Sequence, residues 1–219
     1  MLTVELINNN IPRLKLQDTA GKALQLINDF RVTHLPVIAD EKYLGLISEE
    51  DLQDADEKMP IELMQENFID AAVHENEHFL TAVNCCNQYD TTVVPVVNEE
   101  KELVGVITSP DLLKALGNFA GTNEIGGIIV LEMERSQFAI SEISRIVESN
   151  DATILHLNTT VHPETGMLTV TIHANKKEIA AIVATFERYE YDVIYFFGNE
   201  NFENEIHSNY RHLMNYLDI

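Results

Sequence analysis

Two pairs of side chains in this chain of 219 residues combine a hydroxyl with a carboxylate three residues later. Ser48 and Asp51 form the first pair, and Thr108 and Asp111 form the second pair, 60 residues further along the chain. A hydroxyl donates one hydrogen bond, for example to a phosphate, whereas a carboxylate accepts several, which suits the vicinal hydroxyls of a ribose. The residue types therefore fit two roles, a helix cap used twice or a nucleotide site used twice.

The stretch before each pair is repeated as well. In the first copy the apolar segments Leu35–Ile38 and Tyr43–Ile47 flank a short polar turn, and in the second copy Val93–Val97 and Leu103–Ile107 do the same. Short apolar segments around a polar turn predict two paired strands. An amphipathic helix pattern precedes each strand pair, so a repeat of this length predicts one supersecondary unit used twice.

The ordinary interpretation of a hydroxyl at a helix start is an N-cap, and a carboxylate three residues on comes close to a capping box. The pair occurs twice at the same position of the repeat, directly after an apolar strand. This duplication favours a binding site in addition to a helix cap. Free N–H groups at a helix N-terminus attract an anion. Gly45 and Gly105, three residues before each hydroxyl, are expected to leave room for a planar ring against the backbone.

The doubled pattern Leu/Val-Pro-Val, turn, Gly-x-x-Ser/Thr-x-x-Asp resembles a tandem pair of cystathionine-β-synthase (CBS) domains over residues 1–118. The resemblance implies a disc with clefts for adenosine-containing ligands, which include AMP, ADP, ATP, NAD(H) and S-adenosylmethionine. It implies ribose binding by Asp51 and Asp111, and phosphate contact by Ser48 and Thr108. It also implies that the segments leading into each strand pair line the adenine pocket, with the candidate residues His34, Pro36, Val94 and Pro95.

Cationic side chains are scarce around the two repeats, the candidates being Arg31, His34, Lys42, Lys101 and Lys114. Because a triphosphate carries more negative charge than these groups can balance, we expect adenosine ligands of mono- or diphosphate size, or larger ones bound together with Mg²⁺. Lys101 and Lys114 lie near the second pair in sequence, so the second pair is the expected site of occupancy.

The second half of the chain has a different pattern. Apolar strands and amphipathic helices alternate in the order β-α-β-β-α-β, a ferredoxin-like arrangement, over residues 126–198. The expected strands are Ile128–Met133, Ile154–Leu157, Leu168–Ile172 and Val193–Phe197. This part resembles an ACT domain, but Glu134–Gln137, where ACT domains have a Pro- or Gly-containing turn, contains neither residue. We therefore expect a role in dimerisation or signal relay rather than amino-acid binding.

The predicted fold class is α+β: a tandem CBS pair, a ferredoxin-like ACT-type domain and a C-terminal helix. This order resembles the architecture of AcuB-type acetoin-utilisation proteins, without implying that the chain acts on acetoin. The expected parts are a first CBS unit at 1–57, a second at 58–118, a hinge at 119–125, the ACT-like domain at 126–198, and an amphipathic helix at 199–219 that packs on the body or on a second subunit. The expected assembly is a homodimer.

The composition excludes several partners. A formal charge of −22, spread over both halves, repels nucleic-acid backbones and anionic lipid surfaces. No apolar run approaches the roughly 18 residues that a membrane span needs. The N-terminal segment has no secretory signal pattern, and the adjacent cysteines Cys85 and Cys86 are expected to be buried, unbridged thiols on a helix. We therefore expect a cytoplasmic protein.

Neither metal chemistry nor catalysis is indicated by the remaining motifs. His74 and His78 have the spacing of a zinc-protease motif but precede a helix instead of lying on one. His156 and His173 fall on neighbouring expected strands and are read as ordinary sheet residues. No nucleophile–base motif is present, so we predict neither a metal site, catalytic residues nor enzyme activity.

Three functions remain open. The first is a regulatory sensor that binds an adenosine nucleotide and passes its occupancy to an effector protein by conformational change. The second is a dimeric interaction scaffold whose clefts hold no ligand, motivated by the acidic surface and the scarce cations. The third is a divalent-cation sensor, which would use the charge of −22 directly.

Overall fold

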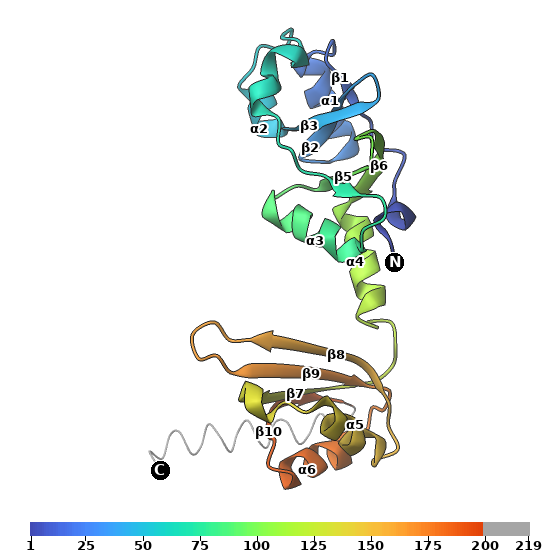
Figure 1. The fold of residues 1–219 in the computed structure, drawn as a ribbon, viewed down its shortest axis with the longest axis vertical. Coiled ribbons are helices and arrows are strands. Elements are labelled where there is room, and N and C mark those ends of the chain that lie inside the picture. The colour runs from blue at the N-terminus through green and yellow to red at the C-terminus, as the bar shows by residue number, and fades with distance from the viewer. Residues whose placement is uncertain (199–219) are drawn as a thin grey trace. The chain divides into compact units, whose positions relative to one another are not determined.

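The computed structural model describes residues 1–198 and contains two compact units, which divide between Gly117 and Asn118 (Figure 1). The first unit contains two three-stranded sheets and the second unit a four-stranded sheet. The helix predicted for 199–219 lies outside the described residues. Within residues 1–198, no helix is both long and apolar enough to span a membrane.

Each half of the first unit folds in the order β-α-β-β-α, as the repeat predicts. The first half contains β1 (Leu14–Lys15), α1 (Ala20–Phe30), β2 (His34–Ala39), β3 (Lys42–Ser48) and α2 (Glu49–Gln53). The second half contains β4 (Val73–His74), α3 (Phe79–Gln88), β5 (Val93–Val97), β6 (Leu103–Thr108) and α4 (Ser109–Phe119). A 3-10 helix opens each half, η1 (Thr3–Leu6) and η2 (Ile61–Asn67).

Local sequence signals explain where these elements begin and turn. Thr19 is the N-cap of α1 and accepts a hydrogen bond from the backbone N–H of Lys22 at 3.3 Å. Asp40 and Glu41 form the two-residue turn between β2 and β3, and both have positive φ angles, 47° and 69°. Positive φ at both central residues is the hairpin geometry that matches strand twist. The middle strand of each sheet runs parallel to the first strand and antiparallel to the third.

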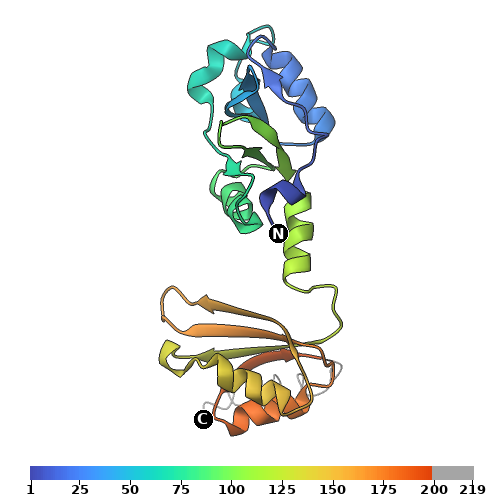
Figure 2. The same cartoon turned by 45° about the vertical axis from the view of Figure 1, so that its right-hand side comes forward.

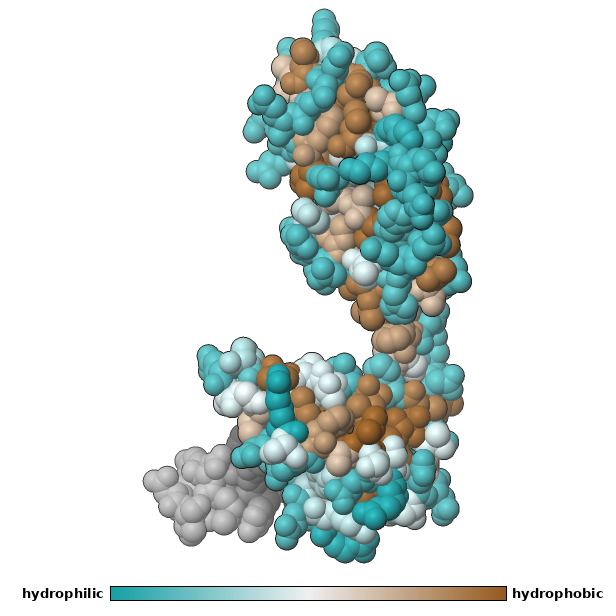
Figure 3. All heavy atoms as spheres, viewed as in Figure 1, coloured by the Kyte–Doolittle hydropathy of each residue, from teal (hydrophilic) through white to brown (hydrophobic). Residues whose placement is uncertain are grey.

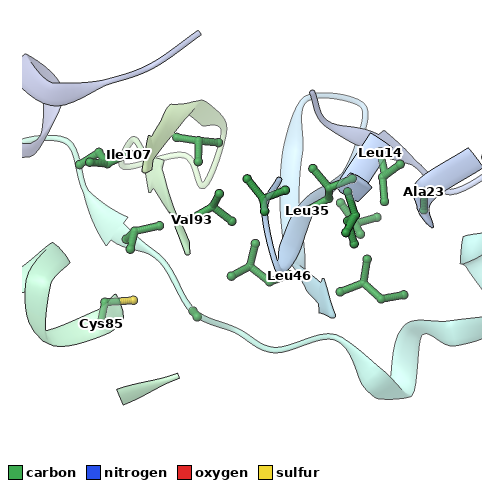
Figure 4. Packing of buried hydrophobic residues seen from close by; sticks show 14 of the residues in the cluster. Leu14, Ala23, Leu35, Leu46, Cys85, Val93 and Ile107 are labelled. Atoms are coloured by element: carbon green, nitrogen blue, oxygen red, sulfur yellow. The ribbon is translucent and has the colours of Figure 1, made fainter. Parts of the chain in front are cut away.

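The two halves share one hydrophobic core (Figure 4). Leu35 and Leu46 from the first half and Val93 and Ile107 from the second half all have an exposed fraction of 0%. A three-stranded sheet of this size cannot bury its apolar face alone, so each half supplies the surface against which the other packs. The doubled sequence is therefore one folding unit.

Helix α3 carries both cysteines. Cys85 is buried in the shared core, and burial raises the pKa of its thiol to about 11. The Cys86 thiol donates a hydrogen bond to the Thr91 carbonyl oxygen, and burial raises the pKa of this thiol as well. The expectation of free thiols on a helix is confirmed, and burial is confirmed for Cys85, whereas Cys86 is only half-buried.

These raised pKa values predict low thiol reactivity in the folded protein. The thiolate is the reactive form, so at about pH 8 the Cys85 thiol should react with an aromatic disulfide reagent at least about ten times more slowly than a free cysteine, and the Cys86 thiol should also be slowed. The measurement is the rate of colour release before and after addition of guanidinium chloride. Equal rates in the folded and unfolded protein would contradict the assignment.

The second unit has the predicted order β-α-β-β-α-β. Its elements are β7 (Gly127–Met133), the 3-10 helix η3 (Arg135–Gln137), α5 (Ile140–Glu148), β8 (Ile154–Val161), β9 (Leu168–Ala174), α6 (Ala180–Arg188) and β10 (Asp192–Phe197). All pairs in the sheet are antiparallel, in the order β10-β7-β9-β8. Both helices cover the same face of the sheet (Figure 2). The other face carries His156 and His173, which lie opposite each other in the β8–β9 pair.

Candidate functional site

Each half of the first unit extends its opening segment onto the last strand of the other half. Asn8 forms a bridge with Val106 in β6, and its N–H lies 2.7 Å from the Val106 carbonyl oxygen. Leu46 in β3 and Ile69 exchange both backbone hydrogen bonds at 2.9 Å. The hydroxyl–carboxylate pairs that follow β3 and β6 therefore each lie next to a segment from the other repeat.

The repeated glycines allow this crossing. A Cβ atom on Gly105 would lie 2.3 Å from Cγ2 of Ile7, and a Cβ atom on Gly45 would lie 2.8 Å from Cβ of Phe68. Ile7 and Phe68 belong to the crossing segments. The expectation that the glycines leave room for a planar ligand ring is therefore wrong, because the chain itself occupies that space.

The first hydroxyl–carboxylate pair forms hydrogen bonds within itself and with the other repeat. Ser48 is the N-cap of α2, and its Oγ accepts a hydrogen bond from the Asp51 N–H at 3.0 Å and donates one to Asp51 Oδ2. The side-chain amide of Asn67, at the end of η2, donates to Asp51 Oδ1 at 2.7 Å. Both carboxylate oxygens of Asp51 therefore already accept a hydrogen bond.

The second pair is arranged similarly, but fewer of its carboxylate oxygens accept a hydrogen bond. Thr108 Oγ1 donates to Asp111 Oδ2 at 2.5 Å and accepts from the Asp111 N–H at 3.4 Å. The amide of Asn8 donates to the same oxygen, Oδ2, at 3.3 Å. Among the hydrogen bonds of residues 1–198, none reaches Asp111 Oδ1. Asp111 therefore keeps one carboxylate oxygen available.

The asparagines at both sites were missed by the sequence motifs. Asn8 and Asn67 lie in the opening segments, where neither periodicity nor a known spacing marks them. Asn8 contacts Asp111, 103 residues away in sequence, and Asn67 contacts Asp51, 16 residues away. The only signal in the sequence is that both amides come from the segment that opens a repeat.

The first N–H group of α2 and of α4 is not free, in contrast to the expectation. The Glu49 N–H donates to the Thr33 carbonyl oxygen and the Ser109 N–H to the Thr92 carbonyl oxygen, both at 2.9 Å. The next residue in α4, Pro110, has no N–H. The expected anion site therefore lacks the first N–H of both helices and, in α4, the second as well, which leaves the Thr108 hydroxyl as a donor for a phosphate there.

Thr33 and Thr92 join the two sites at their centre. The Thr33 N–H donates to Thr92 Oγ1 at 2.8 Å, and the Thr92 N–H donates to Thr33 Oγ1 at 3.1 Å. Their carbonyl oxygens accept from the first residues of α2 and α4. One reciprocal hydrogen-bond cluster therefore positions the start of both helices.

The residues expected around adenine lie on the paired strands. His34, with an exposed fraction of 7%, is opposite Ser48 in the β2–β3 pair. Pro36 and Pro95 are buried in the middle strands, opposite Leu46 and Val106. The Val94 side chain is fully buried in the shared core. Of the four residues, His34 lies directly beside a hydroxyl of the site, whereas Val94 could line a cleft only through its backbone.

Burial lowers the pKa of His34, with Asp51 and Asp90 acting in the opposite direction. The folded protein therefore holds this imidazole neutral where the unfolded chain, with a pKa of 6.5, takes up a proton. The free energy of unfolding should fall as the pH drops through about 6.5 toward the lower pKa of the folded state. His34→Gln should reduce this fall, measured by urea unfolding at about pH 8 and about pH 5. An unchanged pH dependence would contradict this.

Neither a lysine side chain nor a metal-binding cluster near the repeats supplies much positive charge for a phosphate. The Lys42 ammonium lies 2.7 Å from the Glu100 carbonyl oxygen and 3.1 Å from Glu102 Oε1, so it connects the hairpins of the two repeats. In the described part of the chain, no three His, Cys, Asp or Glu side chains are grouped to hold a metal ion. This includes His74 and His78, which lie in β4 and at the N-cap of α3.

A model of the CBS domain matches residues 4–58 and again residues 61–118. The chain belongs to the CBS-domain family. The two matches coincide with the two halves of the first unit, and the sites described above lie within them. CBS-domain pairs are regulatory modules that bind adenosine ligands.

The relatives of this CBS protein match it over the tandem pair. It is 25% identical over 113 residues to inosine-5'-monophosphate dehydrogenase of Methanocaldococcus jannaschii, covering 50% of this chain and 22% of that protein. It is 29% identical over 100 residues to L-aspartate semialdehyde sulfurtransferase of the same organism, covering 44% and 19%. The chain therefore spans about a fifth of the length of these two relatives. A CBS domain pair/ACT domain protein from Thermotoga maritima shares the fold over 54% of this chain and 98% of its own, with 22% identity and a TM-score of 0.50.

Proposed function

We propose that the CBS pair binds an adenosine-containing nucleotide in the clefts at Asp51 and Asp111 and signals its occupancy by conformational change. The ligands considered are AMP, ADP, ATP, NAD(H) and S-adenosylmethionine. The observation that carries the proposal is the hydroxyl–carboxylate pair, which is placed twice where the opening segment of one repeat meets the last strand of the other.

The hydrogen bonds of the pair couple phosphate and ribose recognition. A hydroxyl has one proton, and Ser48 and Thr108 each donate it to a carboxylate in this structure. If either hydroxyl turns to a ligand phosphate, it releases an oxygen of Asp51 or Asp111. That oxygen can then accept a hydrogen bond from a ribose hydroxyl. A ligand that carries both groups is therefore favoured over one that carries either alone.

Signalling follows from the shared construction of the clefts. A ligand shifts a conformational equilibrium only by its difference in affinity for the two states. Here each aspartate accepts a hydrogen bond from the opposite repeat: Asp111 from Asn8 of the first repeat, and Asp51 from Asn67 of the second repeat. A ligand bound at either aspartate therefore acts on a contact between the repeats. The Thr33–Thr92 cluster transmits a shift at one helix start to the other helix start.

We assign the second unit to the ACT type, with a role in dimerisation or relay. The element order and the antiparallel strand order support this assignment. The turn after β7 is exposed, and the side chain of Gln137 accepts from the Glu134 N–H at 2.9 Å. This turn satisfies its own backbone instead of offering it to an amino-acid ligand.

A homodimer is the assembly that we propose, formed in part by the helices of the CBS pair. An apolar groove of about 460 Å³ lies between α3 and α4, and its lining includes Val83, Leu112 and Leu116. Leu113 also lines this groove and has an exposed fraction of 71%, and apolar atoms continue along α4 in Figure 3. An exposed apolar groove of this kind favours burial against a partner. Sedimentation equilibrium of the full chain tests the assembly.

Calorimetric titration tests the proposed ligand. AMP, ATP, NADH and S-adenosylmethionine are each titrated into the full chain, with and without Mg²⁺. We expect at least one of them to bind with a Kd well below about 1 mM, and we expect ATP to depend on Mg²⁺. Failure of all four to bind would overturn the proposal. A stable dimer whose thermal unfolding is unchanged by every nucleotide would indicate an interaction scaffold instead.

A further inference from the structure

The two aspartates differ in how much of each carboxylate is free, and this difference matters if the clefts bind nucleotides as proposed above. Asp51 accepts the Ser48 hydroxyl on Oδ2 and the Asn67 amide on Oδ1 at 2.7 Å. Asp111 accepts both of its donors on Oδ2, and the amide of Asn8 is more distant, at 3.3 Å. Vicinal ribose hydroxyls need carboxylate oxygens that can accept their protons.

We propose that Asn67 closes the first cleft to a ribose, so that the second cleft binds ligand first. A nucleotide can reach Oδ1 of Asp111 without displacing any donor among the described residues. At Asp51 both ribose hydroxyls can be bound only if the Ser48 hydroxyl turns away from Oδ2 and the Asn67 amide gives up or shares its short hydrogen bond to Oδ1. Losing such a bond weakens the first cleft on the order of 10- to 100-fold relative to the second.

The asparagine that closes the cleft is specific to one repeat. Ile69 pairs with Leu46, whereas Asn8 itself pairs with Val106, and these two bridges are equivalent in the repeat. Asn67 lies two residues before Ile69, and the equivalent position in the other repeat is Leu6, which has no side-chain donor. Asn8 thus approaches Asp111 from a different backbone position, which agrees with its longer hydrogen bond.

The position of Asn67 also connects the first cleft to the second repeat. Asn67 ends η2, the helix that opens the second repeat, and its side chain is exposed. Once displaced, an exposed amide is hydrated at little cost, so the closure is reversible. The pair therefore responds in two steps: the second cleft fills at low nucleotide concentration, and the first cleft fills only when the concentration is high enough to displace Asn67.

The experiment uses AMP as the probe and measures stoichiometry by calorimetry on the full chain. The wild type should bind one AMP per chain with high affinity, and Asn67→Ala should bind two. Gln65→Ala, an exposed neighbour on η2, is the matched control and should still bind one. The analogue 2',3'-dideoxy-AMP lacks the ribose hydroxyls and should not distinguish Asn67→Ala from the wild type.

A rescue experiment separates closure from loss of folding. Asp111→Ala should lose high-affinity AMP binding, and Asp111→Ala combined with Asn67→Ala should regain one site, which Asp51→Ala then removes. Two equal sites in the wild type, or a single site in Asn67→Ala, would overturn the inference and leave the proposed function standing. If AMP binds neither the wild type nor any variant, the inference fails together with the proposed function for this nucleotide.

Discussion

Asp111→Ala should weaken nucleotide binding by about 100-fold or more, the largest effect that we expect from any side chain of the site. A ribose makes hydrogen bonds to a charged carboxylate, each contributing about 1.5–3 kcal/mol, and this substitution removes the acceptor of two of them. Asp111 is also the carboxylate with a free oxygen in this structure, so the first binding event depends on it. Calorimetric titration with the best ligand of the wild type measures the change.

The matched control for this prediction is the equivalent substitution in the other repeat. Asp51→Ala changes the same residue type at the same place in the repeat, and it should leave the high-affinity site within about threefold of the wild type. Both substitutions remove a carboxylate that also receives the cap hydroxyl, so both should cost about 1 kcal/mol of stability. The reverse order, with Asp51→Ala abolishing binding and Asp111→Ala leaving it intact, would contradict the assignment.

Much of the first unit could be predicted from the sequence because its signals are local. Two paired strands around a polar turn follow from alternating apolar and turn residues, and the caps at Thr19 and Ser48 follow from side-chain hydroxyls at helix starts. The repeat then places Thr108 and Asp111 in the same geometry as Ser48 and Asp51, which the structure confirms. Features that depend on neighbouring residues, and that recur at the same positions of both repeats, can therefore be predicted from the sequence.

The parts of the site that could not be predicted depend on contacts between the repeats. β1 and β4 are two residues long, too short for a periodic pattern, and the crossing segments are fixed by isolated bridges. The carbonyl oxygens of Thr33 and Thr92 occupy helix N–H groups that appear free when each repeat is read alone. For the same reason neither Asn8 nor Asn67 could be assigned a role before its partner on the other repeat was known.

Gly45→Ala should destabilise the first unit by about 2–4 kcal/mol, because two independent costs act at this position. Gly45 has a φ angle of 155°, a conformation that residues with a side chain rarely adopt. An added Cβ would also lie 2.8 Å from Cβ of Phe68 and 3.1 Å from the Ile69 carbonyl oxygen. Differential scanning calorimetry of the full chain should show the first-unit transition lowered by about 10 °C or more.

Gly105→Ala provides the comparison that separates the two costs. Its φ angle is not in the positive range, and the close contact of its Cβ, at 2.3 Å, is with Cγ2 of Ile7. A side-chain methyl group can turn away, whereas Phe68 Cβ and the Ile69 carbonyl are fixed by the backbone, so Gly105→Ala should cost less than Gly45→Ala. If the two substitutions lower the free energy of unfolding equally, the backbone of residues 61–69 moves as easily as a side chain. The crossing segment that carries Asn67 would then be too loosely held to close the first cleft.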